Sequence, residues 1–195
     1  MSVAKFLKNE TTHLHSKIDD HLLLKQLVSP DLDPYQYRLV LEAIGCWLSM
    51  LKPLFVPLSN APVQKIDLKL GRLSKDLATL GSHLKVNSTH FDVPKLSVPA
   101  LWGAHYVIEG SSLGGVFLAP RIETTLSRQD VTLFYRGDGE QTRPEWINTQ
   151  VELETNLKST NDFEEALFGA SYSFELLYQI LDNVLAESQL IRSAQ

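Results

Sequence analysis

The segment at positions 102–120, WGAHYVIEGSSLGGVFLAP, constrains the fold of this chain more than any other. Its length and apolar content are those of a buried helix. It nevertheless contains four glycines, namely Gly103, Gly110, Gly114 and Gly115. Each glycine inside a helix costs about 1 kcal/mol relative to alanine, so several are tolerated when a neighbour must come close to the backbone. The first three share one helical stripe with Val107. The pattern predicts a helix whose bare strip lies against a flat partner, either another helix or a planar ligand.

The rest of the chain is divided into helical blocks by prolines and polar clusters. Apolar spacing predicts helices over about residues 3–28, 34–52, 63–80, 102–119, 143–157 and 161–188. A short piece follows Pro57, and a short amphipathic piece is expected at RIETTLS (121–127). Asp33-Pro34 provides an N-cap and a first-turn proline, and Pro120 is expected to end the glycine-bearing helix. Only VTLFY (131–135) has a strand-like composition, and the Gly-Asp-Gly at 137–139 predicts a turn. We therefore expect a single all-α domain spanning residues 1–195, with about seven helices around one core.

Composition narrows the function classes. A net charge of −5 argues against a nucleic-acid binder, and an apolar fraction of 44% is that of an ordinary globular domain. The single cysteine, Cys46, lies in an apolar run and is expected to be a core residue in a reducing compartment. We see no secretory signal and no apolar run near the ~20 residues that span a bilayer. These features favour a cytoplasmic protein with no membrane partner.

Among the histidines, His15 has the most informative position. A continuous first helix would place His15 on the apolar face with Ile18 and Leu22, whereas His13 and His21 would point away from that face. Asp19 follows His15 by one turn and is well placed to accept the Nδ1 proton, which would leave Nε2 free to bind a metal. On spacing alone two interpretations stay open, a hydrogen-bonded core histidine and a metal ligand.

Two motifs together resemble haem oxygenases. In the first helix, LKNETTHLHSKID is similar to the proximal helix of that family, and the matching positions are Leu7, Lys8, Thr11, His15 and Asp19. YVIEGSSLGG is similar to the distal helix, especially its bacterial form, and the matching positions are Tyr106, Val107, Glu109, Gly110, Ser111, Leu113, Gly114 and Gly115. Weaker similarities follow in the right order at RLSKDLATLG (72–81) and LFYRGDGEQTRPEW (133–146). Together these segments span most of the chain.

The resemblance implies a multi-helix bundle that holds haem between the first helix and the glycine-bearing distal helix. The activity it implies is O2-dependent cleavage of haem to biliverdin, CO and Fe²⁺, with haem as both cofactor and substrate. It makes His15 the axial iron ligand and assigns the O2 site to Gly110, Ser111 and Gly114. The remaining haem-contacting positions that it suggests are Lys8, Thr11, Tyr106, Arg136 and Arg143.

The resemblance also implies partners. Electrons would come from a ferredoxin, a flavodoxin or an NAD(P)H-dependent reductase. The form of the distal motif is closest to members associated with bacterial phytochromes, so an apo-phytochrome that accepts biliverdin is a further expected partner.

Two departures from the family keep alternatives open. One is the turn Arg136-Gly137-Asp138-Gly139, where many members have Tyr-Gly, and the other is at Ser111. Vertebrate-type members carry an aspartate directly after the first distal glycine, where this chain has Ser111, so protons would have to travel through water and backbone groups. A haem carrier or sensor without turnover would use the same pocket. A related all-α protein with a non-haem pocket, as in thiaminase-like proteins, is a third possibility. Trp146 is expected in the core, while Glu109 is either part of a polar network or an exposed charge.

Overall fold

The computed structural model describes residues 2–58, 60–84, 91 and 93–193. His90 and part of the irregular stretch expected between His83 and Ser97 lie outside the described residues. The helices, in chain order, are α1 (Val3–Glu10), α2 (Thr12–Asp19), α3 (Leu22–Gln26), α4 (Pro34–Leu51), η1 (Lys52–Phe55), α5 (Asn60–Thr79), α6 (Val98–Leu126), α7 (Leu133–Arg136), η3 (Gly139–Gln141), α8 (Thr142–Asn156) and α9 (Thr160–Ser193). No strand occurs within these described ranges, so the all-α expectation is confirmed.

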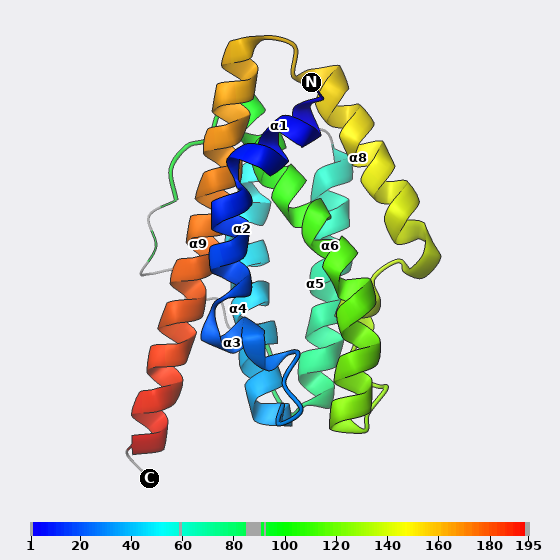
Figure 1. Cartoon of the computed structure of the whole chain (residues 1–195), viewed down its shortest axis with the longest axis vertical. Coiled ribbons are helices and arrows are strands. Elements are labelled where there is room, and N and C mark those ends of the chain that lie inside the picture. The colour runs from blue at the N-terminus through cyan, green and yellow to red at the C-terminus, as the bar shows by residue number, and fades with distance from the viewer. Residues whose placement is uncertain (1, 59, 85–90, 92, 194–195) are drawn as a thin grey trace.

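The two longest helices, α6 and α9, form the frame of the molecule. They are in contact near their N-terminal ends and diverge toward the other end of the molecule (Figure 1). In this view α4 lies between them, with α2 in front and α5 toward the right. Across the described part of the chain, no helix combines the length and the apolar composition needed to cross a bilayer.

Helix α4 starts at the predicted cap and supplies much of the core. The Asp33 side chain accepts a hydrogen bond from the Gln36 amide at 2.7 Å, and the Gln36 side chain accepts one from the Asp33 amide at 3.0 Å. This capping box satisfies two amides that the helix itself leaves unpaired. Further along α4, Cys46 and Trp47 are buried, and the Trp47 indole donates to the Ser173 carbonyl of α9 at 3.0 Å. The expected core role of Cys46 is confirmed.

The first predicted helix is broken into three. The breaks fall at Thr11, which has non-helical dihedrals, and at the Asp20–His21 pair that precedes α3. His21 caps α3 by accepting a hydrogen bond from the Leu23 amide at 3.2 Å, and it is buried rather than pointing away from the core. Apolar spacing alone reports neither the non-helical dihedrals of Thr11 at the first break nor the His21 side-chain cap at the second.

Pro120 lies inside α6 and does not end it, so the expected stop was wrong. The helix continues to Leu126 and ends where Ser127 adopts a left-handed conformation at φ 52°. An interior proline costs about 3 kcal/mol because one backbone hydrogen bond is lost. The continuation buries Ile122 completely and links Glu123 to α7, which offsets that cost.

The strand-like VTLFY stretch forms the short helix α7 instead. Asp76 on α5 accepts hydrogen bonds from the Leu133 and Phe134 amides at 3.0 and 2.8 Å, and so caps the first turn of α7. A carboxylate from a distant helix therefore overrides the local β propensity. The turn expected after this segment is confirmed, because Gly137 and Gly139 have φ values of 52° and 59°.

Candidate functional site

His15 is held by α2 with its imidazole exposed. The buried face of α1 and α2 runs through Leu7, Thr11, Leu14 and Ile18, and His15 lies at the edge of that face with 65% of its side chain exposed. The expectation that His15 lies on the apolar face was therefore wrong, and a core histidine is not what the fold provides. The imidazole is turned toward the Asp19 carboxylate, which is itself 66% exposed. Leu22, the last residue of the expected stripe, belongs to another helix and is also exposed.

The imidazole of His15 is oriented by a carboxylate. Its Nδ1 lies 2.9 Å from Oδ2 of Asp19, one turn further along α2, as the spacing predicted. The ring stands edge-on to the Phe174 ring of α9, with 6.0 Å between centroids. Within the described part of the chain, Nε2 has no hydrogen-bond partner. A neutral imidazole that donates from Nδ1 to a carboxylate presents the Nε2 lone pair for binding a metal.

Thr11 supports this arrangement from the backbone. Its hydroxyl donates to the Leu7 carbonyl at 2.7 Å and is almost fully buried, while its own carbonyl accepts the His15 amide at 3.0 Å. Thr11 thus connects α1 to α2 and fixes the start of the turn that carries His15. Its side chain is committed to the backbone.

The four glycines of α6 have two different environments. A Cβ on Gly103 would overlap the Ala166 carbonyl of α9, and one on Gly115 would lie 2.6 Å from the Tyr135 carbonyl oxygen. These two positions serve helix packing. A Cβ on Gly110 would meet only the Trp146 ring, at 3.6 Å, and one on Gly114 would meet nothing within 4 Å. The stripe predicted contact with either a helix or a planar ligand. Gly103 contacts a helix, whereas Gly114 leaves open space in which a ligand could lie.

The open part of the stripe is bordered by an exposed aromatic side chain. Phe117, one turn beyond Gly114, is 82% exposed. Ser111 is exposed as well, and its hydroxyl donates to the Ile108 carbonyl at 2.7 Å, which leaves its oxygen lone pairs available as acceptors. A bare backbone beside an exposed phenyl ring suits a flat apolar ligand.

Tyr106 and Trp146 form one wall next to Gly110. Their rings pack with 5.5 Å between centroids, and both side chains are half-buried. Desolvation raises the pKa of the Tyr106 phenol, which therefore stays protonated at neutral pH. Trp146 was expected in the core and lies at its boundary instead.

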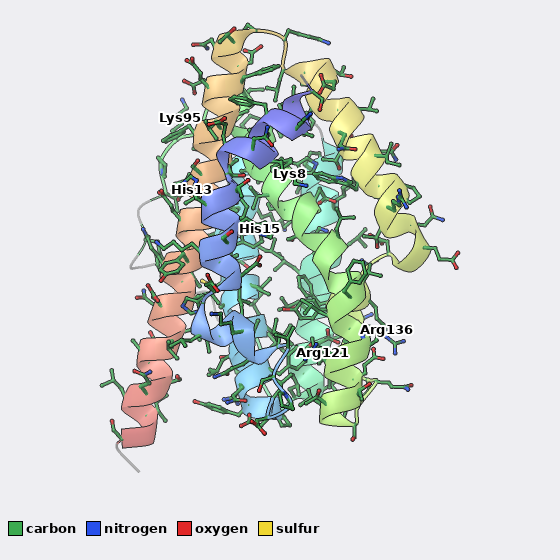
Figure 2. The ribbon with its side chains drawn as sticks, in the orientation of Figure 1. Lys8, His13, His15, Lys95, Arg121 and Arg136 are labelled. Carbon is green, nitrogen blue, oxygen red and sulfur yellow. The ribbon has the colours of Figure 1, made fainter. Side chains whose placement is uncertain are left out.

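The basic residues predicted from the resemblance are not gathered in one place. Lys8 is exposed on α1, the helix that leads into α2 with His15 (Figure 2), and its ammonium has no ion pair among the described residues. Arg143 is exposed in the first turn of α8. Arg136 lies on the far side of α6 from His15, where its Nε is 2.6 Å from Oε1 of Glu123. That contact, with a hydrogen bond from Thr132, holds the pKa of Glu123 below its usual range.

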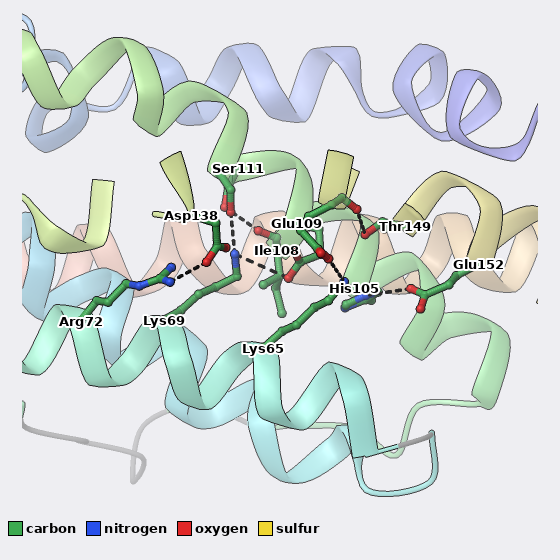
Figure 3. Close-up of polar contacts among 12 residues, drawn as sticks. Lys65, Lys69, Arg72, His105, Ile108, Glu109, Ser111, Asp138, Thr149 and Glu152 are labelled. Atoms are coloured by element: carbon green, nitrogen blue, oxygen red, sulfur yellow. Dashed lines mark hydrogen bonds and ion pairs between the residues drawn. The ribbon is translucent and has the colours of Figure 1, made fainter. Parts of the chain in front are cut away.

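We call the exposed side of α6 around Gly110, Ser111, Gly114 and Phe117 the open face. Next to it lies a polar cluster that the sequence did not predict. Glu109 is buried and pairs with Lys69 of α5, with 3.5 Å between Oε1 and Nζ (Figure 3). Lys69 also donates to the Ser112 hydroxyl at 2.5 Å. Of the two interpretations of Glu109, the polar network is correct. The available signal was the run of cations at positions 65, 69 and 72, which share one face of α5.

The residue types on α2 and α6 are those that bind a planar ligand with a metal centre. Helix α2 carries an imidazole with an oriented nitrogen, and α6 carries the open glycines. In Figure 1, α2 lies in front of α4, and α6 lies to the right of both. The residues present match what haem requires by type: His15 offers an axial nitrogen, Gly110 and Gly114 a bare backbone, and Phe117 an exposed apolar ring.

Comparisons with known proteins identify the fold. No protein-family model matches the chain, and no curated protein matches it in a sequence search. Three similar solved structures are haem oxygenases. The Neisseria meningitidis enzyme, described in its NO- and CO-bound forms, has a TM-score of 0.76 at 20% identity over 95% of this chain and 93% of its own. The Leptospira interrogans enzyme has a TM-score of 0.75 at 17% identity over 94% and 100%. Haem oxygenase-1 of the cyanobacterium Synechocystis, solved with haem, has 0.71 at 16% identity over 100% and 99%.

Proposed function

This chain has the haem oxygenase fold, and we propose that it is a haem oxygenase of bacterial type that cleaves haem to biliverdin, CO and Fe²⁺. One observation carries the proposal. On a helix of that fold, an exposed imidazole is oriented by a carboxylate, and a second helix carries a glycine with nothing within 4 Å of where its Cβ would be.

His15 and Asp19 would hold the ligand from one side. The Asp19 carboxylate accepts the Nδ1 proton, so His15 presents Nε2 as the axial nitrogen, and the pair fixes the direction of the ring. Bound haem would supply an iron centre that activates O2 and a porphyrin that is itself the substrate. Thr11 keeps the turn before His15 in register through its own backbone contacts.

Gly110, Ser111 and Gly114 would shape the opposite side. The two glycines leave space close to the backbone and expose carbonyl oxygens as acceptors. Ser111 donates to the Ile108 carbonyl, so toward the ligand it offers lone pairs to a water molecule and not a proton of its own. Protons would reach the site through water, in place of the carboxylic acid that vertebrate-type members carry there.

The edges of the ligand would meet apolar and basic groups. Phe117 is exposed where it can cover the ring, and Tyr106 with Trp146 closes the region beside Gly110. Lys8 is the basic residue best placed for a haem carboxylate, because it is unpaired on the helix that leads to α2, and Arg143 is a second candidate. Arg136 would have to leave Glu123 to take part, so its assignment has the least support.

The proposal includes the partners expected from the sequence. The enzyme would act in the cytoplasm and take electrons from a ferredoxin, a flavodoxin or an NAD(P)H-dependent reductase. The biliverdin formed would be bound by an apo-phytochrome. Alternatively, the reaction would serve to release iron from haem, with biliverdin as a by-product.

The test is an absorbance time course of hemin-loaded protein in air, with ascorbate or a ferredoxin reductase system and with catalase present. Loss of the Soret band with growth of a broad red band of biliverdin is the expected result. A stable Soret band under both reductants would contradict turnover and favour the haem carrier or sensor. Absence of any Soret shift on adding hemin would contradict haem binding and favour a non-haem pocket.

A further inference from the structure

Three cations on one face of α5 bind acids from three different segments. Lys65 pairs with Glu145 of α8 at 3.0 Å, Lys69 with Glu109 of α6 at 3.5 Å, and Arg72 with Asp138 of the glycine turn at 2.5 Å (Figure 3). All six line one cleft of about 370 Å³. Because the charges balance within each pair, the cleft offers no net charge for a ligand, and its residues are committed to joining α5 to its neighbours.

Lys69 differs from the other two cations in burial and in what it contacts. The side chains of Lys69 and Glu109 are only 12% and 6% exposed, against 24% and 40% for Lys65 and Glu145. Lys69 also reaches Ser112, with 2.5 Å between Nζ and Oγ. Glu109 and Ser112 flank Gly110 and Ser111 in the sequence. The Lys69 ammonium therefore contacts the residues on both sides of this Gly-Ser pair, where the open face of α6 begins.

The buried carboxylate of Glu109 depends on its contact with Lys69. Its Oε1 is buried and has no hydrogen bond, so the ion pair with Lys69 is its main compensation within the described structure. A buried carboxylate that loses its cation must either draw in water or move toward solvent. Since Glu109 directly precedes Gly110, either response displaces the backbone of the open face.

We propose that Lys69 is a positioning residue that fixes where the backbone of residues 109–115 lies relative to α5 and how this part of α6 is rotated about its axis. The inference rests on the proposed haem site, because that backbone would define how the ring is oriented. Lys69 contacts Glu109 and Ser112 and would act on the site through these two residues. Loss of Lys69 should therefore change which position of the ring is cleaved more than it changes how tightly hemin binds.

The test compares Lys69→Met with a matched control, Lys65→Met, one turn away on the same face of α5. In the protein without hemin, Lys69→Met should speed amide hydrogen exchange of residues 109–116 by about tenfold or more and leave residues 98–104 unchanged. In the hemin-loaded protein it should shift the proportions of the biliverdin isomers at least about twofold, while hemin affinity changes less than about threefold. Lys69→Arg should restore both readouts, and Lys65→Met should change neither.

Equal effects of the two methionine variants, or no effect of Lys69→Met on exchange, would overturn the inference. If Lys69→Met does not fold, the double variant Lys69→Met with Glu109→Gln removes the uncompensated charge and takes its place. That variant should fold and still show faster exchange, because the contact to Ser112 is gone; exchange at the wild-type rate would overturn the inference. Failure of the proposed function is separate, since unmodified protein would then show no hemin turnover while the exchange result still stands.

Discussion

The N-terminal half of α6 is held mainly by buried packing, and the C-terminal half is held largely by polar contacts. From Ala100 to Glu109 every residue but Tyr106 is buried, and Gly103 brings the helix against the backbone of α9. Beyond Gly110 the buried positions are Gly115, Ala119 and Ile122. There α6 and α9 diverge, and polar contacts from Lys69 and Glu123 hold the helix (Figure 1).

The difference shows that glycines on one helical stripe can have two roles, close helix packing and an open surface. Gly103 is required because a neighbouring helix occupies the space of a side chain, and Gly169 of α9 has the same relation to the Ala100 carbonyl. Gly114 has the same helical phase, yet the space beside it is open. A tightly packed half anchors the helix, so the other half can keep an exposed face for a ligand without unfolding.

Filling the packed half should have the largest effect. In Gly103→Ala the new methyl group would overlap the Ala166 carbonyl, so α6 and α9 would have to separate. We expect a loss of about 3 kcal/mol in unfolding free energy or more, which lowers the melting temperature by on the order of 10 °C. Thermal denaturation followed by circular dichroism measures this shift.

Gly71→Ala is the matched control, because a Cβ at that position of α5 meets nothing within 4 Å. It should melt at or slightly above the wild-type temperature, since alanine favours the helix by about 1 kcal/mol. A Gly103→Ala protein that melts like the control would show that the two helices are not in backbone contact.

Removing the proposed axial nitrogen should act on hemin and leave the fold intact. His15 is 65% exposed, so His15→Ala should change the melting temperature of the protein without hemin by little. Its hemin complex should lose the Soret position of an imidazole ligand and regain it when free imidazole is added. His13→Ala, an exposed histidine two residues earlier, should give the wild-type spectrum. An unchanged spectrum in His15→Ala would make the ligand assignment wrong.

The polar anchoring of the C-terminal half predicts a smaller, pH-dependent effect. Arg136 and Thr132 hold the pKa of Glu123 below its unfolded value, so its contribution is full above the ordinary glutamate pKa and is lost as the pH falls through the lower folded value. Glu123→Gln should therefore melt below wild type at about pH 7, with the difference shrinking toward about pH 3.

Asp76 does not disturb this comparison. Burial raises the pKa of its carboxyl, which has the opposite effect on stability, because that contribution is lost as the pH rises. It is present in both proteins and cancels in the difference. A gap between Glu123→Gln and wild type that stays constant with pH would argue against the Glu123 contact.

Local features of this structure were predictable from the sequence. The capping box at Asp33, the glycine turn and the His15–Asp19 contact depend on residues within one or two turns of each other. The all-α class follows from apolar spacing, and the resemblance of two separated motifs identified the fold that the comparisons confirm.

What the sequence missed depends on partners far along the chain. VTLFY becomes helical because Asp76, over fifty positions earlier, caps it, and α6 continues past Pro120 because Ile122 finds a buried site. The role of Lys69 depends on the approach of α5 to α6. None of these partners has a fixed spacing in the sequence, so no local pattern reports them.

The most direct test of the central claim is a hemin titration of Gly114→Leu beside its melting temperature. Because residue 114 is exposed and nothing lies within 4 Å of its Cβ position, the leucine should leave the melting temperature within about 2 °C of wild type. It would occupy the open face, so hemin affinity should fall by about tenfold or more. Unchanged hemin binding in a normally folded Gly114→Leu protein would contradict the claim that this half of α6 is kept bare for the ligand.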